Sequence, residues 1–369
     1  MNKQRPSTSP VALVFTALLL FAHGAASQGT GCHRDECTLL TDCPKLLDLL
    51  KNPTLDSIGE LQAATCFINK RQPWVCCPAP VTEPPKVIKE SLLPPNCGLV
   101  GDVRVVGGED APIDAYPWKA VLGYRIGGLP EIHFECGGSV INERYIMTAA
   151  HCVNANILNE RELELAVIRL GEWDLSTEMD CTNTSNGSRF CAPPVQDFDF
   201  EEVIEHPSYD NRTLFSDDIA LIRLSKPINF LTSAGFIQPV CLPPADLSLS
   251  AEARSQGAIV AGWGVTEKGI QSDRLQHLIL PFVENKECNE RYRGNLVAEQ
   301  ICMGGEAGKD SRRGDSGGPL IMKAGSEREV SMQIGIVSYG PTSCGQKGFP
   351  GVYTSVSHYR SWVEETLRP

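Results

Sequence analysis

Fifteen cysteines, arranged in two groups, limit what this 369-residue chain can fold into. Six of them crowd a segment that is too short to bury much of a core, so disulfides must replace hydrophobic burial there. These are Cys32, Cys37, Cys43, Cys66, Cys76 and Cys77. The other nine are spread from Cys97 to Cys344. Six cysteines allow fifteen pairings, and the residues alone do not choose among them. A zinc site is the competing interpretation for these six cysteines. The export signal of the chain and the adjacency of Cys76 and Cys77 disfavour it.

The first residues are typical of an export signal. Lys3 and Arg5 precede an apolar run from Val11 to Ala22, which small residues follow. The run is too short to span a bilayer comfortably, although a membrane anchor is the alternative. We therefore predict a signal peptide over 1–27 and a secreted protein with oxidised cysteines. No later stretch is long and apolar enough to span, so we expect no membrane partner.

Charge and proline content give two further expectations. The net charge is −12 and no long run of Lys and Arg occurs, which argues against nucleic acid as a partner. A proline-rich stretch over 78–104 follows the first cysteine group, and such stretches favour extended, exposed backbone. We therefore expect a small domain over 32–77, a linker and activation segment over 78–104, and a larger domain over 105–369.

The larger domain carries the pattern of short strands. Apolar or alternating runs occur at 132–136, 145–150, 259–264 and 334–337, with no helical pattern between them. Many short strands predict an all-β barrel or sandwich. The end of the chain predicts a C-terminal helix, because four residues repeat there at helical spacing: Tyr359, Trp362, Val363 and Thr366.

Three short segments carry the chemistry. They are Thr148–Cys152, Asp217–Leu221 and Gly314–Pro319. Together, in this order, they resemble the trypsin/chymotrypsin family from residue 105 to the end of the chain. The resemblance implies an all-β fold of two six-stranded barrels with the active site between them, and the activity of a serine endopeptidase.

The resemblance assigns a catalytic role to one residue in each segment. Ser316 is the nucleophile, and a serine hydroxyl needs a neighbouring base to take its proton. His151 is that base, because imidazole titrates near neutral pH. Asp218 fixes the imidazole tautomer and stabilises the charged ring. Asp217 is the neighbouring acid, but Asp218 stands at the family's position, directly before Ile219.

The same resemblance locates the oxyanion hole and the primary specificity pocket. The amides of Gly314 and Ser316 form the oxyanion hole. Asp310, six residues before the nucleophile, lies at the base of the pocket, where an acid selects Arg or Lys. Gly340 and Gly351 match the pocket walls. The alternative for Asp310 is a loop carboxylate that faces water.

The residues at 104–108 resemble the family's activation site. A cut after Arg104 frees the amine of Val105, which the family buries against the acid beside the nucleophile, here Asp315. An unpaired buried carboxylate is costly, so this ion pair acts as a switch. Before the cut, we expect a poorly formed pocket and oxyanion hole, and a secreted but inactive chain when Arg104 is replaced.

Disulfide pairs in the larger domain follow from the resemblance. They are Cys136–Cys152, Cys288–Cys302 and Cys97–Cys241, with Cys181–Cys191 expected to staple a surface loop. The usual partner of Cys344 stands four residues before the nucleophile, where this chain has Arg312. Three interpretations remain open: a looser but working pocket, an intermolecular bond through Cys344, or a variant with low activity.

The small domain, the linker and the protease domain together resemble the clip-domain serine proteases of arthropods. This family implies the pairs Cys32–Cys76, Cys37–Cys66 and Cys43–Cys77. It also implies a zymogen in the haemolymph that cuts a target precursor in Toll, prophenoloxidase and melanisation, or clotting cascades. The implied partners are an upstream activating protease, a downstream protease or prophenoloxidase precursor, and a serpin-type inhibitor. One alternative is a weakly active or non-catalytic clip-domain cofactor, which the presence of Ser316 disfavours. The other is a digestive protease, which the presence of the small domain disfavours.

Two further kinds of site are expected on loops. Some clip-domain relatives bind calcium on the loop that here contains Glu172, Asp174, Thr177 and Asp180, although a solvated acidic loop is the alternative. We expect no organic cofactor. N-glycosylation sequons begin at Asn183, Asn186 and Asn211.

Overall fold

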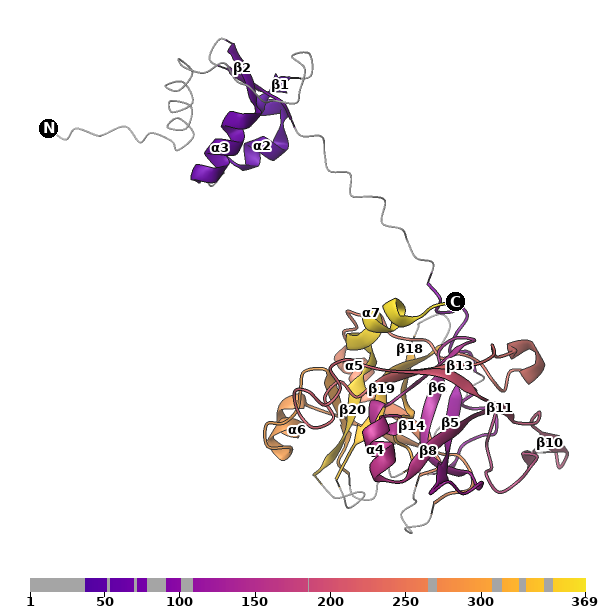
Figure 1. Ribbon diagram of the computed structural model, residues 1–369. Coiled ribbons are helices and arrows are strands. Elements are labelled where there is room, and N and C mark those ends of the chain that lie inside the picture. The colour runs from indigo at the N-terminus through magenta and orange to yellow at the C-terminus, as the bar shows by residue number, and fades with distance from the viewer. Residues whose placement is uncertain are drawn as a thin grey trace. The chain divides into compact units, whose positions relative to one another are not determined.

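A computed structural model of the protein describes most of the chain (Figure 1). The described residues are 37–51, 54–69, 72–77, 91–100, 109–184, 186–264, 271–306, 314–324, 330–341 and 348–369. The chain divides into two compact units, Met1–Lys89 and Glu90–Pro369. Within the described residues, no helix is long and apolar enough to cross a membrane.

The N-terminal unit is a small antiparallel sheet with short helices. The order of its strands is β1-β3-β2. Its elements are β1 (Thr38–Leu39), η2 (Leu40–Asp42), α2 (Pro44–Asp48), α3 (Leu55–Ala64), β2 (Thr65–Asn69) and β3 (Gln72–Val75). Thr54 begins α3 with a reciprocal cap, because its side chain accepts from the amide of Ser57 while Ser57 Oγ accepts from the amide of Thr54.

Disulfides supplement the small core of this unit. Its buried residues are Leu40, Cys43, Leu46, Leu61 and Val75. So few apolar side chains supply little burial, and two disulfides cross the same region: Cys37–Cys66 and Cys43–Cys77. These are the pairs that the family resemblance implies. Cys76 is also disulfide-bonded, and its expected partner, Cys32, lies outside the described residues.

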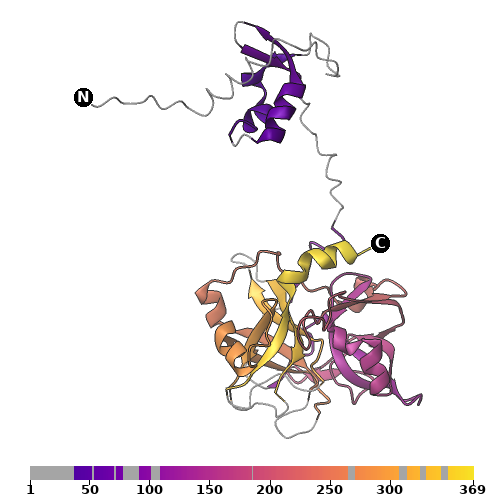
Figure 2. The same cartoon turned by 60° about the vertical axis from the view of Figure 1, so that its left-hand side comes forward.

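The C-terminal unit contains two large antiparallel sheets, which Figures 1 and 2 show beside each other. Within the described residues, the first sheet has the order β11-β8-β5-β6-β7-β13-β12 and the second β16-β17-β20-β19-β18-β14-β15-β4. The strands of the first sheet are β5 (Lys119–Ile126), β6 (His133–Val140), β7 (Tyr145–Thr148), β8 (Leu163–Leu170), β11 (Gln196–Phe198), β12 (Phe200–Glu205) and β13 (Ala220–Leu224). The strands of the second are β4 (Glu109–Asp110), β14 (Ala258–Gly262), β15 (Gln276–Leu280), β16 (Phe282–Val283), β17 (Gln300–Gly304), β18 (Pro319–Ala324), β19 (Val330–Tyr339) and β20 (Pro350–Ser355).

Short edge segments explain why the two sheets exceed the expected six strands each. β11 and β12 are separated only by Asp199, and they pair with opposite edges of the first sheet. In the second sheet, β4 and β16 are two-residue additions. The two-barrel, mostly β architecture expected from the sequence is confirmed.

Short helices and one hairpin complete the unit. They are η3 (Ala150–Cys152), α4 (Ala155–Glu160), the hairpin of β9 (Cys181–Asn183) and β10 (Arg189–Cys191), η4 (Phe230–Ser233), α5 (Ala251–Ser255), α6 (Asn285–Arg291) and α7 (Val356–Thr366). The predicted C-terminal helix is α7, which buries Val356, Tyr359 and Val363. Their spacing of three and four residues places them on one face of the helix.

A disulfide ties the segment before the predicted activation site to the rest of the C-terminal unit. Cys97 is bonded to Cys241, and the amide of Gly98 donates to the carbonyl of Pro239 at 2.8 Å. Gly98 has φ +63°, and a Cβ there would lie 2.2 Å from the carbonyl oxygen of Ser331, so only glycine fits. The other bonds of this unit are Cys136–Cys152, Cys181–Cys191 and Cys288–Cys302.

We predict that this bond keeps the chain in one piece after a cut at Arg104. The cut wild-type protein should run as a single species on a non-reducing gel and as two after reduction. Cys97→Ser should release the N-terminal fragment without reductant, whereas Cys181→Ser, the matched control, should not. Release of the fragment from the unreduced wild type would contradict the bond.

Candidate active site

Two neighbouring strands bring His151 and Asp218 together. The four residues of β7 are all buried, and the chain then turns through η3, which contains His151. β13 lies antiparallel to β7, with Ala220 opposite Thr148. Because the end of one strand meets the start of the other, Asp218, two residues before β13, lies beside His151.

The carboxylate of Asp218 is fully buried and accepts hydrogen bonds from both sheets. Its Oδ2 lies 2.8 Å from Nδ1 of His151, and its Oδ1 accepts from the His151 amide at 2.9 Å. Oδ2 also accepts from Oγ of Ser338 in β19 at 2.5 Å. The carbonyl of Asp218 accepts from Thr354 in β20 at 2.8 Å. These bonds fix the imidazole with Nε2 directed away from the carboxylate. The contact of Ser338 with Asp218 is not predictable from the sequence, because no local pattern signals a contact across 120 residues.

The adjacent acid, Asp217, is directed elsewhere. Its φ of +55° turns the backbone between the two carboxylates. Asp217 accepts two hydrogen bonds from Arg212, at 3.0 and 2.8 Å, and one from Tyr359 of α7 at 3.1 Å. The geometry therefore selects Asp218 as the partner of His151 and gives Asp217 a structural role.

Glycines shape the turn that carries Ser316. Gly314 has φ +102° and Gly317 has φ +75°, conformations that other residues rarely adopt. A Cβ on Gly317 would lie 2.2 Å from Oγ1 of Thr148. The carbonyl of Ser316 accepts from the amide of Gly137 in β6 at 2.7 Å, and the Gly317 amide donates to Val337 of β19 at 2.8 Å. Both sheets therefore hold the turn in place.

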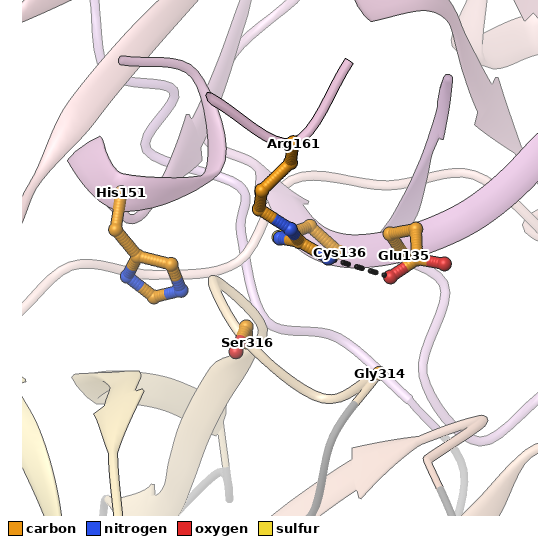
Figure 3. Close-up of a pocket in the computed structure, with 6 residues that line it drawn as sticks. All are labelled: Glu135, Cys136, His151, Arg161, Gly314 and Ser316. Atoms are coloured by element: carbon orange, nitrogen blue, oxygen red, sulfur yellow. Dashed lines mark hydrogen bonds and ion pairs between the residues drawn. The ribbon is translucent and has the colours of Figure 1, made fainter. Parts of the chain in front are cut away.

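A cavity of about 270 Å³ opens at this turn. It is lined by Glu135, Cys136, His151, Arg161, Gly314 and Ser316, and Figure 3 shows the imidazole beside Ser316. Among the described residues, Nε2 of His151 has its polar contact with Sγ of Cys152 at 3.6 Å rather than with Oγ of Ser316. Catalytic hydrogen bonds are often long without substrate and shorten in the substrate complex. The arrangement suits acyl transfer, with a base beside the hydroxyl and glycine-shaped backbone around it.

Some of the remaining predicted residues belong to the described part of the chain. Gly340 follows β19 and Gly351 lies in β20, and the pairing of Tyr339 with Val352 brings both glycines to the same end of these strands. The buried Asp315 accepts from the amide of Gly264 at 3.0 Å. Five residues of the predicted pocket and activation site lie outside the described ranges, so the structure does not test their roles: Arg104, Val105, Asp310, Arg312 and Cys344.

Comparisons with known proteins agree with this geometry. The sequence model of the trypsin family matches residues 105–363, and that of the regulatory CLIP domain of proteinases matches 34–77. The chain belongs to the clip-domain serine proteases. It is 43% identical to melanization protease 1 of Drosophila melanogaster, over 90% of each chain. It is 38% identical to phenoloxidase-activating factor 1 of Holotrichia diomphalia, over 90% of this chain and 91% of that one.

A solved structure supports the same family assignment. The Drosophila Grass clip serine protease of the Toll pathway aligns with a TM-score of 0.62 and 35% identity, covering 89% of this chain and 93% of that one. Together with the trypsin family match, these relatives establish the activity class: the protein is a serine endopeptidase.

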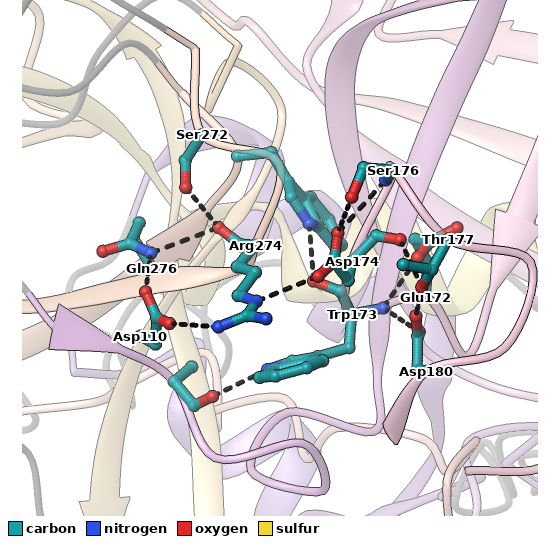
Figure 4. Close-up of polar contacts among 12 residues, drawn as sticks. Asp110, Glu172, Trp173, Asp174, Ser176, Thr177, Asp180, Ser272, Arg274 and Gln276 are labelled. Atoms are coloured by element: carbon teal, nitrogen blue, oxygen red, sulfur yellow. Dashed lines mark hydrogen bonds and ion pairs between the residues drawn. The ribbon is translucent and has the colours of Figure 1, made fainter. Parts of the chain in front are cut away.

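The acidic loop of this clip-domain protease gathers three of the four predicted calcium ligands (Figure 4). Glu172 and Asp180 both accept from the amide of Trp173, at 3.0 and 2.8 Å, and Thr177 donates to Asp180 at 3.0 Å. Burial and the charge of Asp180 raise the pKa of Glu172 to about 7. Two carboxylates so close together would be stabilised by a divalent cation.

The fourth predicted ligand, Asp174, turns to the other side of Trp173. It accepts from Ser176 at 2.6 Å and from Arg274 at 2.9 Å. Burial acts to raise the pKa of Asp174, but these hydrogen bonds outweigh it and the pKa is lowered. The residues present therefore fit a calcium site in part. Within the described residues, the one compact group of potential metal ligands is Cys136, His151 and Cys152, which is a disulfide beside the catalytic base.

The three sequon asparagines are all exposed. Asn183 ends β9 and Asn186 lies in the turn before β10, while Asn211 donates to the carbonyl of Pro207 at 3.2 Å. Their exposure is compatible with glycosylation, which stays a prediction.

We predict different effects from replacing the two adjacent acids. Asp218→Asn in the cut enzyme should lower kcat about 10⁴-fold, because the imidazole would take the wrong tautomer. Asp217→Asn, the matched control, should leave kcat near wild type and lower the free energy of unfolding by about 1–3 kcal/mol, because Arg212 and Tyr359 lose an acceptor. Steady-state kinetics and thermal unfolding measure both. Equal losses of kcat would contradict the assignment.

We also predict that calcium binds the acidic loop. EDTA should lower the midpoint of thermal unfolding and added CaCl2 should restore it, because a ligand of the folded state stabilises that state. Asp180→Asn should abolish the response, whereas Glu178→Gln, an exposed acid of the same loop, should keep it. Stability and activity that do not change with EDTA would rule calcium out.

Proposed function

We propose that this protein is the secreted zymogen of a trypsin-like endopeptidase in an extracellular innate-immune cascade: Toll, prophenoloxidase and melanisation, or clotting. A cut after Arg104 activates it, and the enzyme then cuts a target precursor after Arg or Lys. The observation that carries the proposal is the buried Asp218, which both sheets hold against His151.

The chemistry follows from where the described atoms lie. Nε2 of His151 takes the proton of Ser316 as Oγ attacks the substrate carbonyl, and Asp218 stabilises the imidazolium. The amides of Gly314 and Ser316 would stabilise the oxyanion that forms. The imidazolium then protonates the departing amine, leaving an acyl-enzyme. Water, deprotonated by the same nitrogen, attacks the ester carbonyl, and the imidazolium then returns the proton to Oγ, which frees Ser316 and the new carboxylate.

Substrate choice depends on residues beyond the triad. Asp310 at the base of the pocket would pair with the Arg or Lys before the cut through charge-assisted hydrogen bonds. Gly340 and Gly351 leave the pocket entrance open, because neither has a side chain. Melanization protease 1 is named for melanisation, and phenoloxidase-activating factor 1 is named for the activation of phenoloxidase. We infer for this chain an upstream activating protease, a downstream protease or prophenoloxidase precursor, and a serpin-type inhibitor.

The N-terminal domain supports regulation rather than digestion. The Cys97–Cys241 bond would keep the clip domain attached to the active enzyme, where it can select protein partners. Export through a signal peptide over 1–27 fits the seven expected cysteine pairs, six of which are bonded in the described residues. The haemolymph is the compartment that we infer.

The activation site gives the direct experiment. The wild-type chain, treated with a trypsin-like protease, should hydrolyse a chromogenic Arg substrate and a candidate precursor. Arg104→Gln should be secreted but show no turnover, because no new amine reaches Asp315. Ser316→Ala, cut in the same way, is the matched control for contaminating activity. Turnover by treated Arg104→Gln equal to that of wild type would refute activation at this site.

A further inference from the structure

Lys119 is a lysine buried between the two sheets of the protease unit, with an exposed fraction of only 4%. It is the first residue of β5, in the first sheet. Its side chain reaches the second sheet, where Nζ donates to the carbonyl of Ala261 in β14 at 2.7 Å. This is its one hydrogen bond among the described residues, although an ammonium has three donors. Charged side chains are rarely buried without a function or a counter-charge.

The ammonium lies directly behind the turn that carries the nucleophile. A Cβ on Gly318 would lie 2.5 Å from Nζ, and one on Gly137 would lie 2.9 Å from it. Two backbone positions without side chains therefore make room for this group. Gly137 is also the residue whose amide bonds the carbonyl of Ser316.

Asp315, the acid of the proposed activation switch, contacts the same stretch of the second sheet from the Ser316 turn. Asp315 accepts from the amide of Gly264 at 3.0 Å, and its carboxylate contacts the backbone of Gly262 so closely that a Cβ there would lie 1.9 Å from Oδ1. Gly262 directly follows Ala261, the residue that Nζ bonds. Burial lowers the pKa of Lys119 to about 8, and the charge of Asp315 acts in the opposite direction. Lys119 is therefore mostly an ammonium at neutral pH.

We propose that Lys119 is a permanent second cation of the Asp315 site, a positioning residue that stabilises the buried carboxylate in the uncut chain and so keeps the Ser316 turn partly ordered before activation. The proposal rests on the proposed function, in which the amine of Val105 reaches Asp315 after the cut. Ser316 of the uncut chain then reacts slowly rather than not at all. The cut enzyme depends less on Lys119, because the new amine supplies a charge of its own.

The competing role is purely structural, a hydrogen bond that joins β5 to β14. Loss of such a bond would lower the reactivity of Ser316 equally in the cut and uncut forms. Loss of a charge that the new amine can replace would lower the reactivity of Ser316 chiefly in the uncut form. Comparison of the two forms therefore separates the two roles.

The test measures the rate at which a fluorescent fluorophosphonate labels Ser316, a reaction that accumulates and so detects reactivity below the limit of a turnover assay. Lys119→Met and Lys119→Gln are each made in the cleavable chain, which is then cut, and in the uncut Arg104→Gln chain. Gln keeps a donor for Ala261 but no charge. Lys226→Met removes a lysine from the surface as the matched control.

We expect both Lys119 variants to slow labelling of the uncut chain about tenfold or more and to slow the cut chain much less. Lys226→Met should change neither. Equal losses in both forms, or normal labelling of uncut Lys119→Gln, would overturn the inference and leave the proposed function standing. A cut wild-type chain that does not label would overturn both.

Discussion

The buried carboxylate of Asp218 is the constraint on which the protease unit depends. It is wholly shielded from water, and an unpaired charge in that position would cost several kcal/mol. Its donors come from opposite sides: His151 follows a strand of the first sheet and Ser338 belongs to the second. The charge is satisfied only when the two sheets dock in this register, so one interaction sets both the packing and the catalytic geometry.

Close packing of backbone extends this constraint to the nucleophile. The turn that carries Ser316 is hydrogen-bonded to both sheets. Thr148 lies so close to Gly317, and Lys119 so close to Gly318, that neither position has room for a side chain. A small change in how the sheets meet would therefore move the hydroxyl and the imidazole together. This coupling is the physical reason why a new amine beside Asp315 would switch the site as a unit.

Local patterns in the sequence were enough to predict part of this arrangement. The apolar run before His151 and the helical spacing of α7 specify their own elements, and the resemblance of the three motifs to the trypsin family indicated the triad. Contacts between distant residues were not readable. Nothing near Ser338 signals its bond to Asp218, and Asp174 shares its loop with Asp180 but turns to Arg274 instead. Lys119 begins a strand, where a lysine would ordinarily be exposed, and only the docking of the second sheet buries it.

The most direct test of the catalytic assignment is to map the adduct formed by the cut enzyme and a diphenyl phosphonate ester of an arginine peptide. Mass spectrometry of the digested protein should find one phosphonyl group per molecule, on the peptide that contains Ser316. The adduct should be absent when His151 is replaced by Ala, because the hydroxyl then lacks its base. A fully cut, folded enzyme with Ser316 unmodified would contradict the account.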